Sequence, residues 1–379
     1  MRWTIIAAAL VLVSSASAAQ TSGTAVALVT AEQQNMLVAV ELSSGKVLRR
    51  VSLPADPQNL AVGDRAVVAV STRAAAVTLL DERSLRILKV FRGFADPHIV
   101  AVGRGGRLAY VTDDARGELV VIGLGARRIV DRAFVGAGAH HMAVSPSGSR
   151  LWIALGEHAS AISIVDLSRP SRPRLLRRFS PGFVAHDLTF SPDGRRVWVT
   201  SGVGDSVHVL DAHTGKQVFA VPVGAAPQHV AFAGHGFAFV TSGYSSRIVK
   251  IAPRTGRVLA TAPTPYGSFN LSASLNTRAV VTTSLMSGRV TEFDTNLHRL
   301  STVKAARAAR AVALTVWPSP QRARKITRVP ASRTGPRHLS VGAAWPKTNR
   351  SPMRNQEGFR RAISSRMISG SRPSASSKS

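Results

Sequence analysis

The chain contains no cysteine and few acidic residues, and each shortage excludes or indicates something. Without cysteine among its 379 residues there can be no disulfide, no thiolate nucleophile, no cysteine-ligated metal and no lipid anchor on cysteine. Asp and Glu number 20 against 49 Lys and Arg, which gives a net charge of +29. Hydrophobic residues still make up 45% of the chain and charged residues 18%, a balance that suits a buried core.

Linear motifs of several enzyme classes are also missing. The chain has no His-Glu-x-x-His motif, no phosphate-binding loop ending in Gly-Lys-Ser/Thr and no Gly-x-Ser-x-Gly nucleophile elbow. No strong catalytic pattern therefore points to a reaction, and any active site would have to be assembled by the fold.

Residues 1–19 have the pattern of a secretory signal peptide. Arg2 supplies the positive charge, residues 5–13 form an apolar stretch, and the small residues at 14–19 suit cleavage. The apolar stretch is too short to cross about 30 Å of hydrocarbon as a helix. We therefore expect a secreted or periplasmic protein that loses this peptide.

The composition changes abruptly near the other end of the chain. Residues 318–379 are rich in Ser, Arg and Pro, with 14 Lys and Arg against the single acid Glu357, a net charge of +13. Such a segment cannot bury enough apolar surface to offset its ordering entropy, so we expect a disordered basic tail. The basic charge favours contact with an anionic cell-envelope polymer, and no specific nucleic acid is expected.

Residues 20–317 are repetitive. The clearest unit, residues 185–221, contains four β-rich segments separated by turns rich in Pro, Asp and Gly. Aligned copies recur at intervals of 40, 42, 46, 42, 40 and 42 residues, measured at the following positions: Gln58, His98, His140, His186, Gln228, Ser268 and Arg310. A period of 40–46 residues with four strands per period predicts an all-β propeller with four-stranded blades.

The repeat count also predicts how the ring closes. There are seven copies of the second to fourth strands, but the first copy begins near Ala25, directly after the expected signal peptide, so its blade lacks an inner strand. Residues 309–316 have the inner-strand pattern at the far end. We expect this C-terminal strand to complete blade one, giving seven blades without an exposed sheet edge.

Several repeat segments resemble those of the YVTN-repeat propellers. They include Tyr110-Val111-Thr112-Asp113, Val199-Thr200-Ser201 and the turn Ser191-Pro192-Asp193-Gly194. The resemblance covers about residues 25–317 and implies the propeller fold. It implies no single activity, because that family contains surface-layer and secreted proteins and neighbouring propeller groups include lactonases and a lyase.

Candidate site residues gather where the inner strands begin. In a propeller these positions surround the mouth of the central channel, which is the default binding site. The candidates at the mouth are Gln58, His98, His140, His141, His186, Asp187, Gln228, His229 and Arg310. Loops expected on the same face add Glu32, Asp113, Asp114, Glu157, His158, Asp205 and Tyr244.

Three interpretations of these residues stay open from sequence. They could serve the structure by hydrogen-bonding the crowded inner strands. They could bind a small polar ligand or a protein loop. They could hold a divalent metal, with His98, His140 and His186 as candidate ligands, or supply a general base.

Our leading prediction is a secreted, monomeric scaffold that binds a ligand or protein partner at the channel mouth without catalysis. The alternative is a metal-assisted hydrolase or lyase with a His/Asp/Glu site at the propeller axis. No cofactor is predicted apart from the divalent metal that this alternative would need.

Overall fold

The computed structural model describes residues 23–63, 65–224 and 226–318. The expected signal peptide, residues 1–19, and residues 319–379 of the expected tail lie outside this part of the chain. No helix in the described part is both long and apolar enough to cross a membrane.

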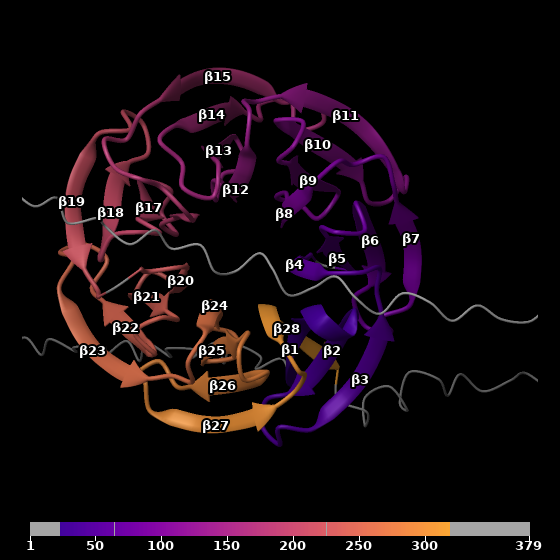
Figure 1. The fold of residues 1–379 in the computed structure, drawn as a ribbon, viewed down its shortest axis with the longest axis vertical. Coiled ribbons are helices and arrows are strands. Elements are labelled where there is room, and N and C mark those ends of the chain that lie inside the picture. The colour runs from indigo at the N-terminus through magenta and orange to yellow at the C-terminus, as the bar shows by residue number, and fades with distance from the viewer. Residues whose placement is uncertain (1–22, 64, 225, 319–379) are drawn as a thin grey trace, which may run out of the picture. The chain divides into compact units, whose positions relative to one another are not determined.

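Seven four-stranded antiparallel sheets form a ring around a central axis (Figure 1). This confirms the predicted seven-bladed all-β propeller. In blades 2 to 7 the strands follow one another outward from the axis, and in blade 1 the last strand of the chain, β28, takes the innermost place.

The first four blades contain these elements. Blade 1 consists of β28 (Ala309–Pro318), β1 (Gly23–Ala31), the 3-10 helix η1 (Glu32–Gln34), β2 (Met36–Glu41) and β3 (Val47–Ser52). Blade 2 consists of β4 (Pro57–Val62), β5 (Ala66–Ser71), β6 (Ala76–Asp81) and β7 (Ile87–Phe91). Blade 3 consists of β8 (Pro97–Val102), β9 (Leu108–Asp113), β10 (Glu118–Gly123) and β11 (Arg128–Phe134). Blade 4 consists of β12 (Ala139–Val144), β13 (Arg150–Leu155), β14 (Ile162–Asp166) and β15 (Arg174–Phe179).

The last three blades complete the ring. Blade 5 consists of β16 (Leu188–Phe190), β17 (Arg196–Thr200), β18 (Ser206–Asp211) and β19 (Gln217–Pro222). Blade 6 consists of β20 (Val230–Ala233), β21 (Phe237–Ser242), β22 (Arg247–Ile251) and β23 (Val258–Pro263). Blade 7 consists of β24 (Ser268–Ser274), β25 (Ala279–Ser284), β26 (Arg289–Phe293) and β27 (Arg299–Lys304).

The core lies between the blades. Second and third strands such as β5 and β6 are almost wholly buried, because both faces of each sheet pack against neighbouring blades. Continuous apolar runs such as residues 66–70 are typical of strands buried on both faces. The buried side chains form one cluster at each of the seven blade interfaces. Outer strands such as β15 are mostly exposed, which is why arginines occupy them.

Strand β28 closes the ring as predicted, and it extends one residue beyond the expected end of the propeller, to Pro318. It pairs antiparallel with β1, from Gly23 opposite Pro318 to Ala31 opposite Ala309. On the neighbouring blade, the buried Glu82 side chain accepts a hydrogen bond from the Thr315 hydroxyl. The two ends of the propeller are thus held together by a sheet and not by a disulfide.

Candidate functional site

Each inner strand carries a β-bulge near its start at the channel mouth. In β12 the bulge sets His140 and His141 together opposite one residue, Ala154, and in β8 it sets His98 and Ile99 together opposite Thr112. The other five inner strands have the same irregularity. A bulge breaks the alternation of a strand and can re-aim a side chain. Two consecutive residues such as His140 and His141 can therefore both reach the mouth.

Threonines of the second strands brace these bulges. The hydroxyl of Thr112 accepts a hydrogen bond from the backbone N–H of Ile99 (3.1 Å) and donates to the carbonyl of His140 in the next blade (2.7 Å). Thr200 does the same between blades 5 and 6, with the N–H of Asp187 and the carbonyl of Gln228, each at 3.0 Å. At these two bulges the backbone is therefore satisfied by threonines and not by the histidines; blades 2 and 4 have Val70 and Ala154 in place of the threonine.

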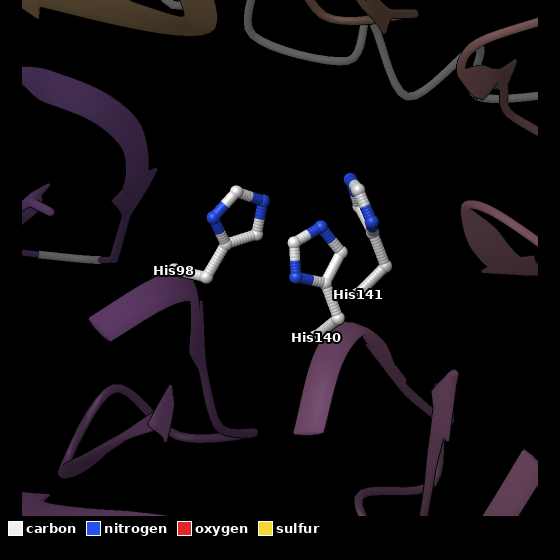
Figure 2. Close-up of side chains that lie close together, drawn as sticks. All are labelled: His98, His140 and His141. Atoms are coloured by element: carbon white, nitrogen blue, oxygen red, sulfur yellow. The ribbon is translucent and has the colours of Figure 1, made fainter. Parts of the chain in front are cut away.

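Five imidazoles from four neighbouring blades meet at the mouth. The rings of His98 and His140 stack with their centroids 3.7 Å apart, and His141 lies 4.8 Å from His140 (Figure 2). On its other side, the His141 ring lies 4.3 Å from that of His186 and 5.6 Å from that of His229. His141 therefore occupies the middle of the cluster.

Carboxylates and a carbonyl fix the orientation of three of these rings. Nδ1 of His140 lies 2.6 Å from Oδ2 of Asp114, and Nδ1 of His229 lies 3.0 Å from Oδ2 of Asp187. Nδ1 of His186 lies 3.1 Å from the carbonyl oxygen of Glu157. Since carboxylate and carbonyl oxygens only accept hydrogen bonds, each Nδ1 carries a proton, and in the neutral ring the lone pair is therefore on Nε2.

Burial favours the neutral form of three of the imidazoles, His98, His141 and His186. It lowers the pKa of His98 and His141 well below the ordinary value, and the neighbouring imidazoles act in the same direction. Burial and His229 also lower the pKa of His186, against the raising effect of the Glu157 carbonyl. At neutral pH these three rings are therefore lone-pair donors rather than cations.

Two histidine trios have the spacing of a metal site. The potential ligand nitrogens of His98, His140 and His141 all lie within 4.8 Å of one another, and so do those of His141, His186 and His229. Hydrogen bonds from ligating imidazoles to carboxylates or carbonyls are typical of metal sites, where they fix the tautomer. Neutral imidazoles suit zinc, copper, nickel and iron rather than calcium or magnesium.

The remaining predicted residues lie at the mouth but hydrogen-bond to residues of the loops. Gln58 and Gln228 turn back on their own loops, donating to Asp56 (2.9 Å) and to the Ala226 carbonyl (3.2 Å). Arg310 pairs with Glu32 at 3.0 Å and borders the same small cavity as His98 and His141.

The expected alignment was wrong in blade 7. The register of β24 sets Phe269 and Asn270 opposite Thr283, so Phe269 and not Ser268 corresponds to His186. The Ser268 hydroxyl is buried and donates to the Pro265 carbonyl. The register of β24 against β25 decides which residue is equivalent, and the sequence alone does not show that register.

Sequence reasoning also missed two amides at the mouth. Asn59 and Asn270 border the cavity, because each is the second residue of its bulge. The signal that could have found them was already present in blades 4 to 6, where His141, Asp187 and His229 occupy the same second position.

No family model matches the sequence, and no curated protein matches it either. Solved structures do match. A functionally unknown protein from Desulfotomaculum acetoxidans has a TM-score of 0.67 at 13% identity, over 78% of this chain and 99% of its own. AztD from Citrobacter koseri has a TM-score of 0.62 at 11% identity, over 78% and 98%. A candidate 6-phosphogluconolactonase from Bacteroides fragilis has a TM-score of 0.63 at 14% identity, over 78% and 99%.

Identities this low establish the fold alone. Together with the seven blades, they show that the chain is a seven-bladed propeller. The chemistry at the mouth has to be argued from this chain's own residues.

Proposed function

We propose that this protein is a non-catalytic propeller that binds a divalent transition-metal ion at the mouth of its channel. The observation that carries the proposal is the convergence of five imidazoles, whose potential ligand nitrogens fall into two trios each within 4.8 Å. Three imidazoles are an established ligand set for zinc; the open fourth position that goes with it is typical of catalytic zinc sites, so the non-catalytic part of the proposal rests on the size of the cavity.

The hydrogen bonds behind the imidazoles support metal binding over simple packing. Asp114 and Asp187 each hold a histidine by Nδ1 and leave Nε2 for a ligand bond. A buried imidazole N–H needs an acceptor in any case, but a carboxylate acceptor also makes the other ring nitrogen a stronger metal ligand. The negative charges would also offset part of the charge of a bound cation, which would otherwise be costly to bury.

The size of the cavity favours binding over catalysis. The space bordered by His98, His141, His229 and Arg310 is about 30 Å³. That volume matches a water molecule or an ion. Sites for organic ligands usually measure about 300 to 1,000 Å³, so this cavity itself is the size for an ion or a water molecule and not for an organic substrate.

The proposal also covers the location of the protein and the family to which it is related. The signal-peptide pattern of residues 1–19 supports a secreted or periplasmic protein, and the Tyr110-Val111-Thr112-Asp113 core supports a relationship to the YVTN-repeat propellers. An extracytoplasmic location would be consistent with a metal site built without cysteine.

A cobalt titration of full-length, tag-free protein tests the proposal. We expect saturable Co²⁺ binding with the visible spectrum of nitrogen coordination. The His98→Ala/His186→Ala double variant, which removes a ligand from each trio, should lose it. The His213→Ala/His298→Ala variant is the matched control, because both of these imidazoles are exposed. Absence of binding by the wild type, or equal binding by both double variants, would contradict the proposal.

A further inference from the structure

His141 belongs to both histidine trios. Its ring lies between the His98–His140 stack on one side and His186 and His229 on the other. The two trios share His141 and no other residue. This overlap distinguishes the cluster from two independent sites and from one site with five equal ligands.

A neutral imidazole can serve only one trio at a time. One of its nitrogens carries a proton and the other carries the lone pair, so it forms one ligand bond. When His141 completes the trio with His98 and His140, the trio with His186 and His229 lacks its third ligand, and the reverse also holds.

We propose that the mouth holds a single metal ion that exchanges between two positions, with His141 as the ligand common to both. This inference rests on the proposed function. The first position uses His98 and His140, and the second uses His186 and His229.

The hydrogen bonding of His141 fits such an exchange. Its Nδ1 is buried and has no hydrogen-bond partner, whereas Nδ1 of His140, His186 and His229 each has one. His140, His186 and His229 therefore have fixed tautomers, whereas no hydrogen bond to Nδ1 fixes the tautomer of the shared ligand, His141. The lone pair of His141 can lie on either nitrogen without breaking a hydrogen bond of Nδ1.

The two positions are built alike. Each has one histidine oriented by a carboxylate, His140 by Asp114 and His229 by Asp187. Each position therefore has one negative charge behind its ligands. Two divalent ions so close together would repel four times as strongly as two single charges at the same distance. Arg310, which borders the same cavity, adds further positive charge.

Zinc titration of the full-length protein, monitored by calorimetry and by competition with a chelator, tests this inference. We expect one ion per chain. His98→Phe and His186→Phe should each still bind one ion, with an association constant lowered about twofold if the positions are equal, since the total constant is the sum of the two. His141→Phe should weaken zinc binding by more than about a hundredfold. That loss of affinity is larger than the one expected when a residue that only hydrogen-bonds to a metal ligand is removed.

The controls separate this inference from the proposed function. The His98→Phe/His186→Phe double variant should match His141→Phe, and His213→Ala should match the wild type. Two ions per chain, or a His98→Phe loss as large as that of His141→Phe, would overturn the exchange while leaving metal binding intact. No binding by the wild type would overturn both. The wild-type stoichiometry decides between one and two ions even if a variant fails to fold.

Discussion

Replacing Thr112 with valine should test whether the threonines hold the mouth together. The substitution keeps the branched shape of a fully buried side chain and removes only its hydroxyl. Two hydrogen bonds disappear, one from the N–H of Ile99 and one to the carbonyl of His140. Each contributes about 0.5–1.5 kcal/mol, so the free energy of unfolding should fall by about 1–3 kcal/mol.

The chain offers a matched control. Thr78 is equally buried, but its hydroxyl has no hydrogen-bond partner. Thr78→Val removes a buried polar group that gains nothing from the fold, so stability should stay constant or rise. Both variants are compared with the wild type by urea denaturation in EDTA, and their metal affinities are then measured. Only Thr112→Val should weaken metal binding, because Thr112 links the strands of His98 and His140.

Equal stability of the two variants would refute this reasoning. It would mean that the bulges are held by the strands on either side of them and that the hydroxyls add nothing. A loss of stability without a loss of metal affinity would be equally informative. It would show that the threonine stabilises the ring without positioning the imidazoles.

Three further predictions concern pH, a turn and the surface charge. Because burial lowers the pKa of His98, His141 and His186, the unfolded chain binds more protons than the folded chain below about pH 6.5. The free energy of unfolding of the metal-free protein should therefore be highest above that pH. Below it, the free energy should fall by up to about 1.4 kcal/mol per pH unit for each histidine. A urea midpoint that stays constant from pH 7 to 5 would contradict this. Gly288→Ala should lower the melting temperature strongly, since Gly288 has a φ of +65° and an added Cβ would collide with backbone, whereas Gly125→Ala meets open space and should not. With a net charge of +29, the protein should bind a sulfated polysaccharide resin in 0.1 M salt. It should be released near 1 M salt, because the Debye length falls from about 10 to 3 Å. Retention unchanged by salt would exclude electrostatic attachment to an anionic polymer.

The fold could be predicted from the sequence because a propeller repeats its information. The period of 40–46 residues, the four strands per period and the missing first inner strand each constrain the same architecture. The prediction that residues 309–316 complete blade one followed from counting strands. No long-range contact had to be guessed, because the ring leaves only one unfilled inner position.

The site was harder to predict because bulges are invisible to periodicity. The repeat alignment named His98, His140 and His186 at one position per blade, and His141, Asp187 and His229 at the position after it. It could not show that a bulge is what lets two consecutive residues reach the mouth, nor that His141 would lie between four other imidazoles. Asp114 was expected on a loop of this face, but its pairing with His140 depends on the path of the loop, which no pattern of apolar residues specifies.

The interpretation that the histidines merely support the inner strands becomes weaker once the bulges are compared. Blade 2 forms the same bulge with Gln58, and blade 7 forms it with Phe269. The backbone contacts between these strands come from threonine hydroxyls such as Thr112 and Thr241, which act whether or not a histidine is present. The fold therefore requires a bulge in each blade but no imidazole there. Five imidazoles gathered on one side of the mouth are better explained by a ligand that binds nitrogen.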